Sequence, residues 1–141
     1  PAYGNGTPPY DLFVVNFKIP FHELSITTEN PWLSELAERN PYAYKILINS
    51  ETAVRKGVRD GDEIWVESEA GKVKGVAKVT ECIHPEVIGI TGVFGSWAAG
   101  KPVAKGKGVH FNTLLPLNMD RIDPISSGVD SCIRVKVSRA A

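Results

Sequence analysis

The side chains of this chain that could do chemistry are three histidines and a scattered group of amides and hydroxyls. The intervals between His22, His84 and His110 match no zinc-binding pattern. His84 precedes Pro85 and is expected to be a surface residue at a corner of the chain. His22 and His110 fall in irregular segments, where an internal hydrogen bond and a hydrogen bond to a ligand are equally compatible with the sequence.

The other polar residues indicate binding rather than catalysis. The sequence contains no glycine-rich phosphate loop, no Gly-x-Ser-x-Gly and no His-Glu-x-x-His. Amides and hydroxyls at strand ends suit the edge of a purine or a pterin, and glycine N–H groups suit a diphosphate. Turn and capping chemistry is the alternative explanation, and it is favoured for Thr28 and Asn30 taken alone. The polar candidates are Asn16, Lys18, Thr27, Thr28, Asn30 and Asn112, and the glycines are Gly92, Gly95, Gly100, Gly106 and Gly108.

Two short helices are expected among the elements that would position these side chains. One covers residues 31–38, because Asn30 is a favourable N-cap and Pro31 a favourable first helical residue. The other covers residues 52–56 and ends at Gly57, which suits the left-handed conformation that closes a helix. The apolar residues that can share one side of the first helix are Trp32, Leu33 and Leu36.

Short apolar or alternating runs predict about six strands. Without a long amphipathic helix, this pattern is typical of a mainly β protein, a β-barrel with helical decorations. Closing the sheet would also remove the edges that such apolar strands would otherwise expose. The expected strands are residues 12–17, 45–48, 63–68, 72–79, 87–90 and 132–137.

The glycine-rich segment over residues 91–112 has a different character. It shows no convincing periodicity and is expected to be a long surface loop. Loops of this length in compact domains usually serve a site or are disordered, and aromatic residues favour a binding loop. The aromatic and histidine residues of this loop are Phe94, Trp97, His110 and Phe111.

Length, charge and cysteine content limit the class of protein. A chain of 141 residues is sufficient for one domain with a substantial core. Sixteen basic and sixteen acidic residues cancel, so neither nucleic acid nor an anionic membrane surface is indicated as a partner. No apolar run is long enough for a membrane-spanning helix, so direct membrane insertion is not expected. Cys82 and Cys132 lack metal-type spacing and are expected to be buried thiols.

The first ten residues differ from the rest of the chain. Residues 1–10, PAYGNGTPPY, are rich in glycine and proline and are interpreted as a linker, which leaves residues 11–141 as the folded domain. The chain begins with Pro1 rather than methionine and is expected to be a piece of a longer protein. An exported parent protein and a membrane-associated one both fit, so the localisation stays open.

Several longer phrases resemble one known family. They are FVVNFKIPFHELSITTENPWLSEL, ILINSETAVRKGVRDGDEIWVESEAGKVKGVAKVTECIHPEVIGITGVFGSW, GVHFNTLLP and DPISSGVDSCIRVKV. In this order, over residues 10–138, they resemble the C-terminal molybdopterin-dinucleotide-binding domain of the dimethyl sulfoxide reductase family. The spacing from His22 through Thr27 to Asn30, and the phrase VFGSW, are most similar to the branch of polysulfide, thiosulfate, tetrathionate and arsenate reductases.

The resemblance implies a double-psi β-barrel that binds one of two molybdopterin guanine dinucleotide cofactors. Molybdenum or tungsten and the catalytic chemistry would then belong to the remaining domains of an oxidoreductase, with iron-sulfur and membrane-anchor subunits as further candidate partners. This segment would hold no catalytic residue and no metal ligand, and neither Cys82 nor Cys132 inherits such a role. The resemblance assigns to the cofactor Asn16, Lys18, His22, Thr27, Thr28 and Asn30 on one side, and Gly95, Ser96, Trp97, His110, Phe111 and Asn112 on the other.

The sequence also departs from the family pattern in two places. The family often has Thr-Gly-Arg where Asn16, Phe17 and Lys18 stand, so a bidentate arginine is replaced by a point charge. A histidine that is frequent before the glycine-aromatic loop is replaced around Thr91 and Gly92. The alternative function is a stand-alone interaction or substrate-recognition module without cofactor, because the same barrel occurs in adaptor domains of ATP-driven unfoldases. Such a module would need an exposed peptide groove.

Overall fold

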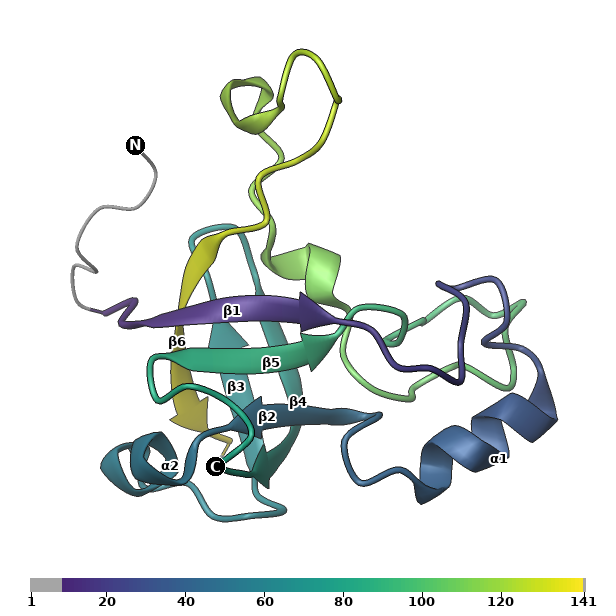
Figure 1. Cartoon of the computed structure of the whole chain (residues 1–141), viewed down its shortest axis with the longest axis horizontal. Helices are drawn as coiled ribbons and strands as arrows, with labels where there is room; N and C mark the ends of the chain where they lie inside the picture. Colours follow the sequence, from purple (N-terminus) through teal and green to yellow (C-terminus); the bar gives the residue numbers. More distant parts are fainter. Residues whose placement is uncertain (1–8, 141) are drawn as a thin grey trace.

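A computed structural model, which describes residues 9–140, shows a barrel of six strands (Figure 1). Two α-helices, α1 (Pro31–Arg39) and α2 (Ser50–Lys56), and two 3-10 helices, η1 (Phe111–Leu114) and η2 (Met119–Arg121), lie in the connections. The predicted strands and α-helices are confirmed, with ends that shift by at most two residues. The strands are β1 (Leu12–Phe17), β2 (Lys45–Ile48), β3 (Glu63–Glu67), β4 (Lys72–Val79), β5 (Val87–Thr91) and β6 (Ile133–Arg139).

The predicted linker at residues 1–10 falls mainly outside the described residues, so the division of the chain at residue 10 stays a prediction. Among residues 9–140, no helix is both long enough and apolar enough to cross a membrane.

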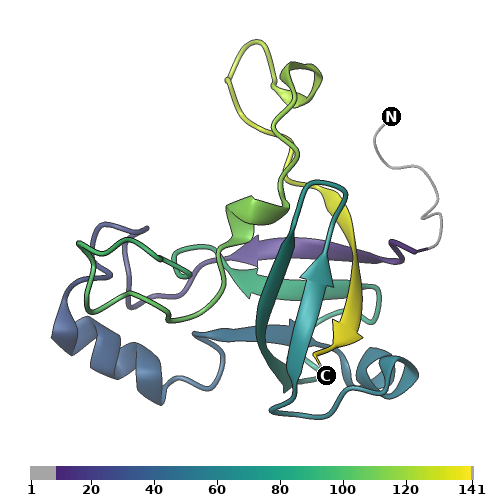
Figure 2. The ribbon, with the colours of Figure 1, turned by 180° about the vertical axis from the view of Figure 1, so that it is seen from behind.

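The strand order is that of a double-psi barrel, which confirms the predicted fold class. The order around the closed barrel is β1-β5-β2-β4-β3-β6. The pairs β1·β5 and β2·β4 are parallel, and the other neighbours are antiparallel. Exchanging β1 with β4, β2 with β5 and β3 with β6 reproduces the same set of pairs. The barrel therefore consists of two interlocked halves of three strands each, and Figure 2 shows its other side from behind.

The strand directions decide which connections meet at each end of the barrel. Because β1 and β5 are parallel, Phe17 and Thr91 lie side by side where both strands stop. β2 and β6 begin at this end, since β2 is antiparallel to β5 and β6 is antiparallel to β1. The connection 18–44 and the part of the connection 92–132 that precedes η1 therefore lie here, at what we call the loop end, whereas residues 115–132 project from the top of the barrel in Figure 1. The connections at residues 49–62, which include α2, and at residues 80–86 lie at the opposite, α2 end.

Apolar side chains fill the barrel and cover both of its ends. Ile64 and Val66 of β3 alternate inward, and both are 0% exposed. Phe111 of η1 joins the core at the loop end, and Ala53 of α2 joins it at the α2 end. Burial of such side chains is the main favourable contribution to folding. The largest fully buried apolar side chains are Leu12, Ile46, Ile48, Ile64, Ile88, Ile90 and Leu114.

Helix α1 buries a different face from the one that its apolar residues suggest. Trp32 and Leu36 are 79% and 49% exposed, whereas Ser34 and Ala37 are buried. Small residues face inward because a second hydrophobic cluster, described below, packs closely against Ala37. The side that Trp32, Leu33 and Leu36 can share is therefore not the buried face of the helix: Trp32 and Leu36 point towards water, and Leu33 is half-buried.

The prediction of two buried thiols is also wrong. Cys82 is exposed and Cys132 is partly exposed, and both are free. Cys82 lies in the corner between β4 and β5, where its N–H donates to Oγ1 of Thr80 at 3.1 Å. A residue in such a corner has no core beside it, so its exposure follows from the position of the turn.

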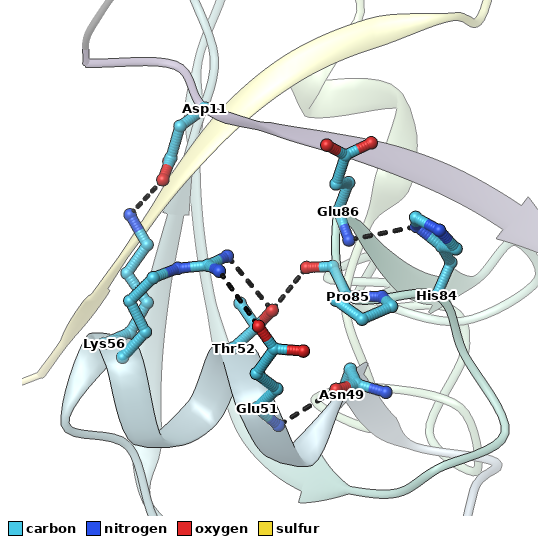
Figure 3. Close-up of polar contacts among 9 residues, drawn as sticks. Asp11, Asn49, Glu51, Thr52, Lys56, His84, Pro85 and Glu86 are labelled. Carbon is cyan, nitrogen blue, oxygen red and sulfur yellow. Dashed lines mark hydrogen bonds and ion pairs between the residues drawn. The ribbon is translucent and has the colours of Figure 1, made fainter.

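Side-chain hydrogen bonds tie helix α2 to the connection between β4 and β5 (Figure 3). Oδ1 of Asn49 caps the helix by accepting from the N–H of Glu51 at 2.9 Å, and Gly57 ends it with the predicted positive φ of 65°. Thr52 is 0% exposed, and its hydroxyl donates to the carbonyl oxygen of Pro85. The bond between Thr52 and Pro85 thus holds α2 against the connection at this end of the barrel.

We expect Thr52→Val to lower the free energy of unfolding by about 1–3 kcal/mol, because the carbonyl of Pro85 would lose its donor in a buried place. The matched control is Val54→Thr on the same helix, where the side chain is 82% exposed and the change should stay within about 0.5 kcal/mol. Urea denaturation of both variants measures the difference. Equal stabilities would show that this bond does not tie α2 to the barrel.

Candidate functional site

All twelve residues that the sequence assigns to a ligand lie at the loop end. Asn16 and Lys18 stand at the end of β1, and His22 to Asn30 follow in the connection 18–44. Residues 95–112 belong to the connection that leaves β5. The two groups come together because β1 and β5 stop side by side. Their role in binding stays a prediction, and the side-chain contacts show which of them can face a ligand.

A second hydrophobic cluster, outside the barrel, joins the two long connections. Its central ring is Phe94, whose centroid lies 4.3 Å from that of Tyr44 and 5.4 Å from that of His22. The cluster holds the segment after β5 against the segment after β1, so the loop end has a fixed shape. Its buried apolar members are Ile19, Ala37, Ala43, Val93 and Phe94, with Phe17, Phe21 and Tyr44 packed against them.

The glycine-rich segment over 92–110 is irregular, as predicted, but it is not simply a surface loop. Val93, Phe94, Ala104 and Val109 are each no more than 6% exposed. The first two residues belong to the second cluster, and Val109 belongs to the barrel core. Single apolar residues separated by glycines anchor this segment, and such spacing gives no periodic signal in the sequence.

Two acidic side chains that the sequence analysis missed reinforce this packing. The carboxylate of Glu29 accepts from the N–H of Ala104 at 2.9 Å and from the N–H of Val103 at 3.2 Å. Glu38 of α1 pairs with Nζ of Lys107 at 2.5 Å. Both contacts join residues about seventy positions apart, so no local pattern could have indicated them.

His22 supports the site rather than facing an open surface. It is 5% exposed, and its Nδ1 lies 3.2 Å from Oγ1 of Thr27, which also accepts from the N–H of Glu23 at 2.9 Å. Its buried Nε2 has no hydrogen-bond partner within residues 9–140. Burial lowers the pKa of His22 below its ordinary value, so the imidazole is neutral at pH 7. The ring therefore fixes the turn that follows β1.

One residue of that turn is strained. Leu24 has a φ of 51°, in the left-handed region that costs a side chain with a Cβ about 1–2 kcal/mol. Leu24 and Ile26 are 52% and 77% exposed, so neither side chain gains burial in return within the described residues. Strain of this kind is found where the surrounding structure determines the backbone, and here the bonds of Thr27 do so.

Three of the predicted residues have clear structural roles. Thr28 is 2% exposed and donates to the carbonyl of Ser25 at 2.9 Å. Oδ1 of Asn30 accepts from the N–H of Trp32 at 3.0 Å, which confirms its role as the N-cap of α1. Phe111 is 3% exposed and completes the barrel core. A direct contact of these three with a ligand stays a prediction.

Five other predicted residues have side chains that are available to a ligand, and we call them the displayed groups. Within residues 9–140, the side chains of Asn16, Lys18, Ser96 and Asn112 have no recorded hydrogen bond or ion pair. Asn16, Lys18 and Asn112 are exposed, and Trp97 is 69% exposed. Two amides, one ammonium, one hydroxyl and one indole are thus available at the loop end.

A groove of about 310 Å³ lies between β4 and the glycine-rich segment. His110 borders it; Nδ1 of His110 lies 2.9 Å from Oγ1 of Thr113, and its ring centroid lies 4.7 Å from that of Trp97. Lys105, which the sequence analysis did not select, adds a further cation to this end. The groove is lined by Val73, Lys74, Gly95, Ser96, Trp97, Lys105, Gly106, Gly108, Val109 and His110.

Two glycines allow close approaches that shape the site. A Cβ added to Gly95 would lie 2.1 Å from the backbone nitrogen of His110, and Gly95 has a φ of 86°. A Cβ added to Gly92 would lie 1.9 Å from Oδ1 of Asn16, so the amide of Asn16 rests against this bare backbone. In residues 9–140, no group of three His, Cys, Asp or Glu side chains could hold a metal ion.

Comparison with known proteins connects this geometry to a family. Residues 12–131 match the sequence family described as "Molydopterin dinucleotide binding domain". The chain is 35% identical over 130 residues to the thiosulfate reductase molybdopterin-containing subunit PhsA of Salmonella typhimurium, covering 92% of this chain and 16% of that protein. It is 30% identical over 95 residues to the periplasmic nitrate reductase of Desulfovibrio desulfuricans, covering 64% of this chain and 12% of that protein. The chain thus spans less than a fifth of the length of these relatives.

A solved structure shares the fold. Acetylene hydratase from Pelobacter acetylenicus superposes with a TM-score of 0.71 at 17% sequence identity. The superposition covers 93% of this chain and 18% of that one. At this identity the likeness supports the barrel and its connections, and nothing about the reaction.

Because His22 is buried, we expect the free energy of unfolding to depend on pH. Because its pKa is lowered in the folded state, the folded chain is stabilised by the neutral ring above about pH 6.5, and this contribution falls as the pH drops through the folded pKa. His22→Phe keeps an aromatic ring against Phe94 and cannot be protonated. Denaturation from pH 5 to 8 should show the free energy of unfolding of the wild type falling towards acid relative to the variant. Parallel curves would contradict a buried neutral His22.

Gly95→Ala should disrupt the loop end, whereas Gly100→Ala should not. The first change combines a backbone clash with a positive φ, and we expect it to cost about 2–4 kcal/mol of unfolding free energy. A Cβ on Gly100, in the same segment, meets nothing within 4 Å, so that variant serves as the matched control. Thermal denaturation measures the loss of stability, and the NMR amide resonances of residues 92–112 show whether the structure of the segment changes. A stable, unchanged Gly95→Ala would exclude the close approach to His110.

Proposed function

This chain belongs to the molybdopterin dinucleotide-binding domain family, and on that premise we propose that its loop end binds molybdopterin guanine dinucleotide as part of a larger oxidoreductase. The observation that carries the proposal is the gathering, at one end of the barrel, of side chains that make no hydrogen bond or ion pair with residues 9–140 and that come from the end of β1 and from both long connections. They are Asn16, Lys18, Ser96, Trp97 and Asn112.

The chemistry of these donors fits such a ligand. A pterin and a guanine each present donors and acceptors along one edge, and the amides of Asn16 and Asn112 offer both kinds of group. A diphosphate requires cations and N–H donors, which Lys18 and Lys105 and the glycine backbone supply. The exposed indole of Trp97 offers a flat apolar surface for a ring. The donor set therefore fits a dinucleotide better than it fits a small anion alone.

This chain would orient and shield the cofactor rather than react. When bound, the cofactor supplies the redox chemistry, and the protein around it supplies position and polarity. Asn16 is held against Gly92, so its amide has a defined place at the end of β1. His22, neutral and buried, would keep the turn after β1 in shape without adding charge beside the pterin. The isolated chain is therefore expected to be inactive.

We propose further that the parent enzyme acts on a sulfur or oxyanion compound. The 35% identity to a thiosulfate reductase subunit supports this class, as does the spacing from His22 through Thr27 to Asn30. The remaining domains of that enzyme would be the principal partners, and iron-sulfur and membrane-anchor subunits are proposed on the family resemblance. A stand-alone interaction module is not favoured, because the family match covers residues 12–131.

A titration with guanosine diphosphate tests the binding proposal. At millimolar concentration it should shift amide resonances at residues 16–30 and 92–112, and leave α2 unchanged. Lys18→Ala should weaken binding about tenfold or more, because a charge-assisted contact to phosphate is lost. Arg59→Ala removes an exposed cation at the α2 end and is the matched control.

The outcome that contradicts the proposal is equally concrete. Shifts spread over α2, or equal affinities for the Lys18 and Arg59 variants, would mean that the nucleotide is attracted by charge alone. The absence of any shift at the loop end would show that the displayed groups do not recognise the guanine nucleotide part of the cofactor.

A further inference from the structure

The connection from β5 to β6 carries an arm that stands away from the barrel. Residues 115–132 leave η1, pass through η2 and return to β6, as the yellow-green segment at the top of Figures 1 and 2 shows. None of these residues is buried, and the structure describes all of them. We call residues 115–132 the arm. Only Leu115, at the base of the arm, packs against the barrel core, so the core cannot set the shape of the rest of the arm.

The arm is nevertheless ordered by its own hydrogen bonds. Ile122 and Val129 form an isolated antiparallel bridge between its two sides. At the tip, Oδ1 of Asp123 accepts from the N–H groups of Ile125 and Ser126, both at 2.8 Å. Side-chain to backbone bonds of this kind fix a turn. The arm therefore holds its tip in a defined shape instead of folding back onto the barrel.

That shape places large apolar side chains in water. Ile125 is 95% exposed, Leu117 is 84% exposed and Met119 is 80% exposed. None of the three belongs to either hydrophobic cluster of the described residues. Single exposed apolar residues are ordinary, but several on one ordered projection mark an interaction site.

The arm is also acidic. It carries Asp120, Asp123 and Asp130 against one cation, Arg121, in a chain whose net charge is zero. The N–H groups of Ser126 and Ile125 lower the pKa of Asp123, so its carboxylate stays charged at pH 7. Apolar side chains bordered by carboxylates are complementary to an apolar groove bordered by lysine or arginine. Charge therefore selects among the surfaces that could cover the arm.

We propose that the arm docks into an apolar groove with a basic border on the remaining part of the parent oxidoreductase polypeptide. The inference rests on the proposed function, because it requires that larger polypeptide, and the matched thiosulfate reductase subunit is several times longer than this chain. The arm follows the glycine-rich segment in the same connection between β5 and β6. Docking would therefore hold that connection against the remaining domains of the enzyme.

Photo-cross-linking in the full-length enzyme tests the docking. The reactive residue p-benzoylphenylalanine is placed at position 119, at position 125 or, as a control, at position 54. Val54 is 82% exposed, as much as Met119, but lies on α2 at the opposite end. After irradiation, mass spectrometry should find intramolecular links from positions 119 and 125 to peptides outside this domain that contain lysine or arginine beside apolar residues. The yield at position 54 should be at least five times lower.

A double variant tests the docking by a second route, and its melting temperature shows whether the chain still folds. The double variant Met119→Ser with Ile125→Ser should leave the melting temperature of the isolated 141-residue chain unchanged, because neither side chain packs on its clusters. In the full-length enzyme it should speed hydrogen exchange of the arm about tenfold or more. Links to a second copy of the chain, or equal yields at positions 119, 125 and 54, would overturn the proposal.

The two proposals fail separately. Cross-links without guanosine diphosphate shifts would leave the docking arm intact and remove the cofactor role of the loop end. Shifts without cross-links would do the reverse.

Discussion

The parallel pairing of β1 with β5 is the constraint from which the candidate site follows. Phe17 pairs with Thr91, so two segments that are far apart in the sequence leave the barrel from the same place. Had β5 run the other way, the turn after β1 and the glycine-rich segment would stand at opposite ends. Strand direction thus brings the displayed groups together before any side chain is considered. It also assigns α2 to the opposite end, where a hydrogen bond holds it against the connection between β4 and β5.

Pairing alone would bring two loose loops together, and packing outside the barrel gives them a shape. Phe94 lies against Tyr44 and His22, and Glu29 binds the backbone of the facing segment. Of the residues predicted to bind a ligand, these contacts use the buried His22 and leave others, such as Asn16, free to meet a ligand. The buried supporting residues and the exposed residues also differ in charge. The buried histidine is neutral, so the positive charge at this end comes from exposed lysines that water screens until a ligand excludes it.

Much of the barrel could be predicted from local signals, whereas the surroundings of the site could not. Alternation over β3 and β4, the cap at Asn30 and the glycine at 57 are each decided by neighbouring residues, and each was found. The inward face of α1 and the burial of Phe94 depend on a cluster that joins residues 19–44 to residues 93–94. The spacing of residues along one segment cannot reveal partners from another segment. For this reason the exposure of Trp32 and of Cys82 could not be predicted. The resemblance to a family supplied the architecture that local patterns leave open.

The interlocked halves of the barrel set an order of events for biosynthesis. β1 has β5 and β6 as neighbours, so Leu12 meets Val135 only after nearly the whole domain has left the ribosome. Until then the first strand keeps an open edge, a situation that slows folding and favours chaperone binding. The loop end cannot form before β5 and the glycine-rich segment have been synthesised, because both connections depend on β5. A ligand that binds there must therefore enter after most of the domain has been translated.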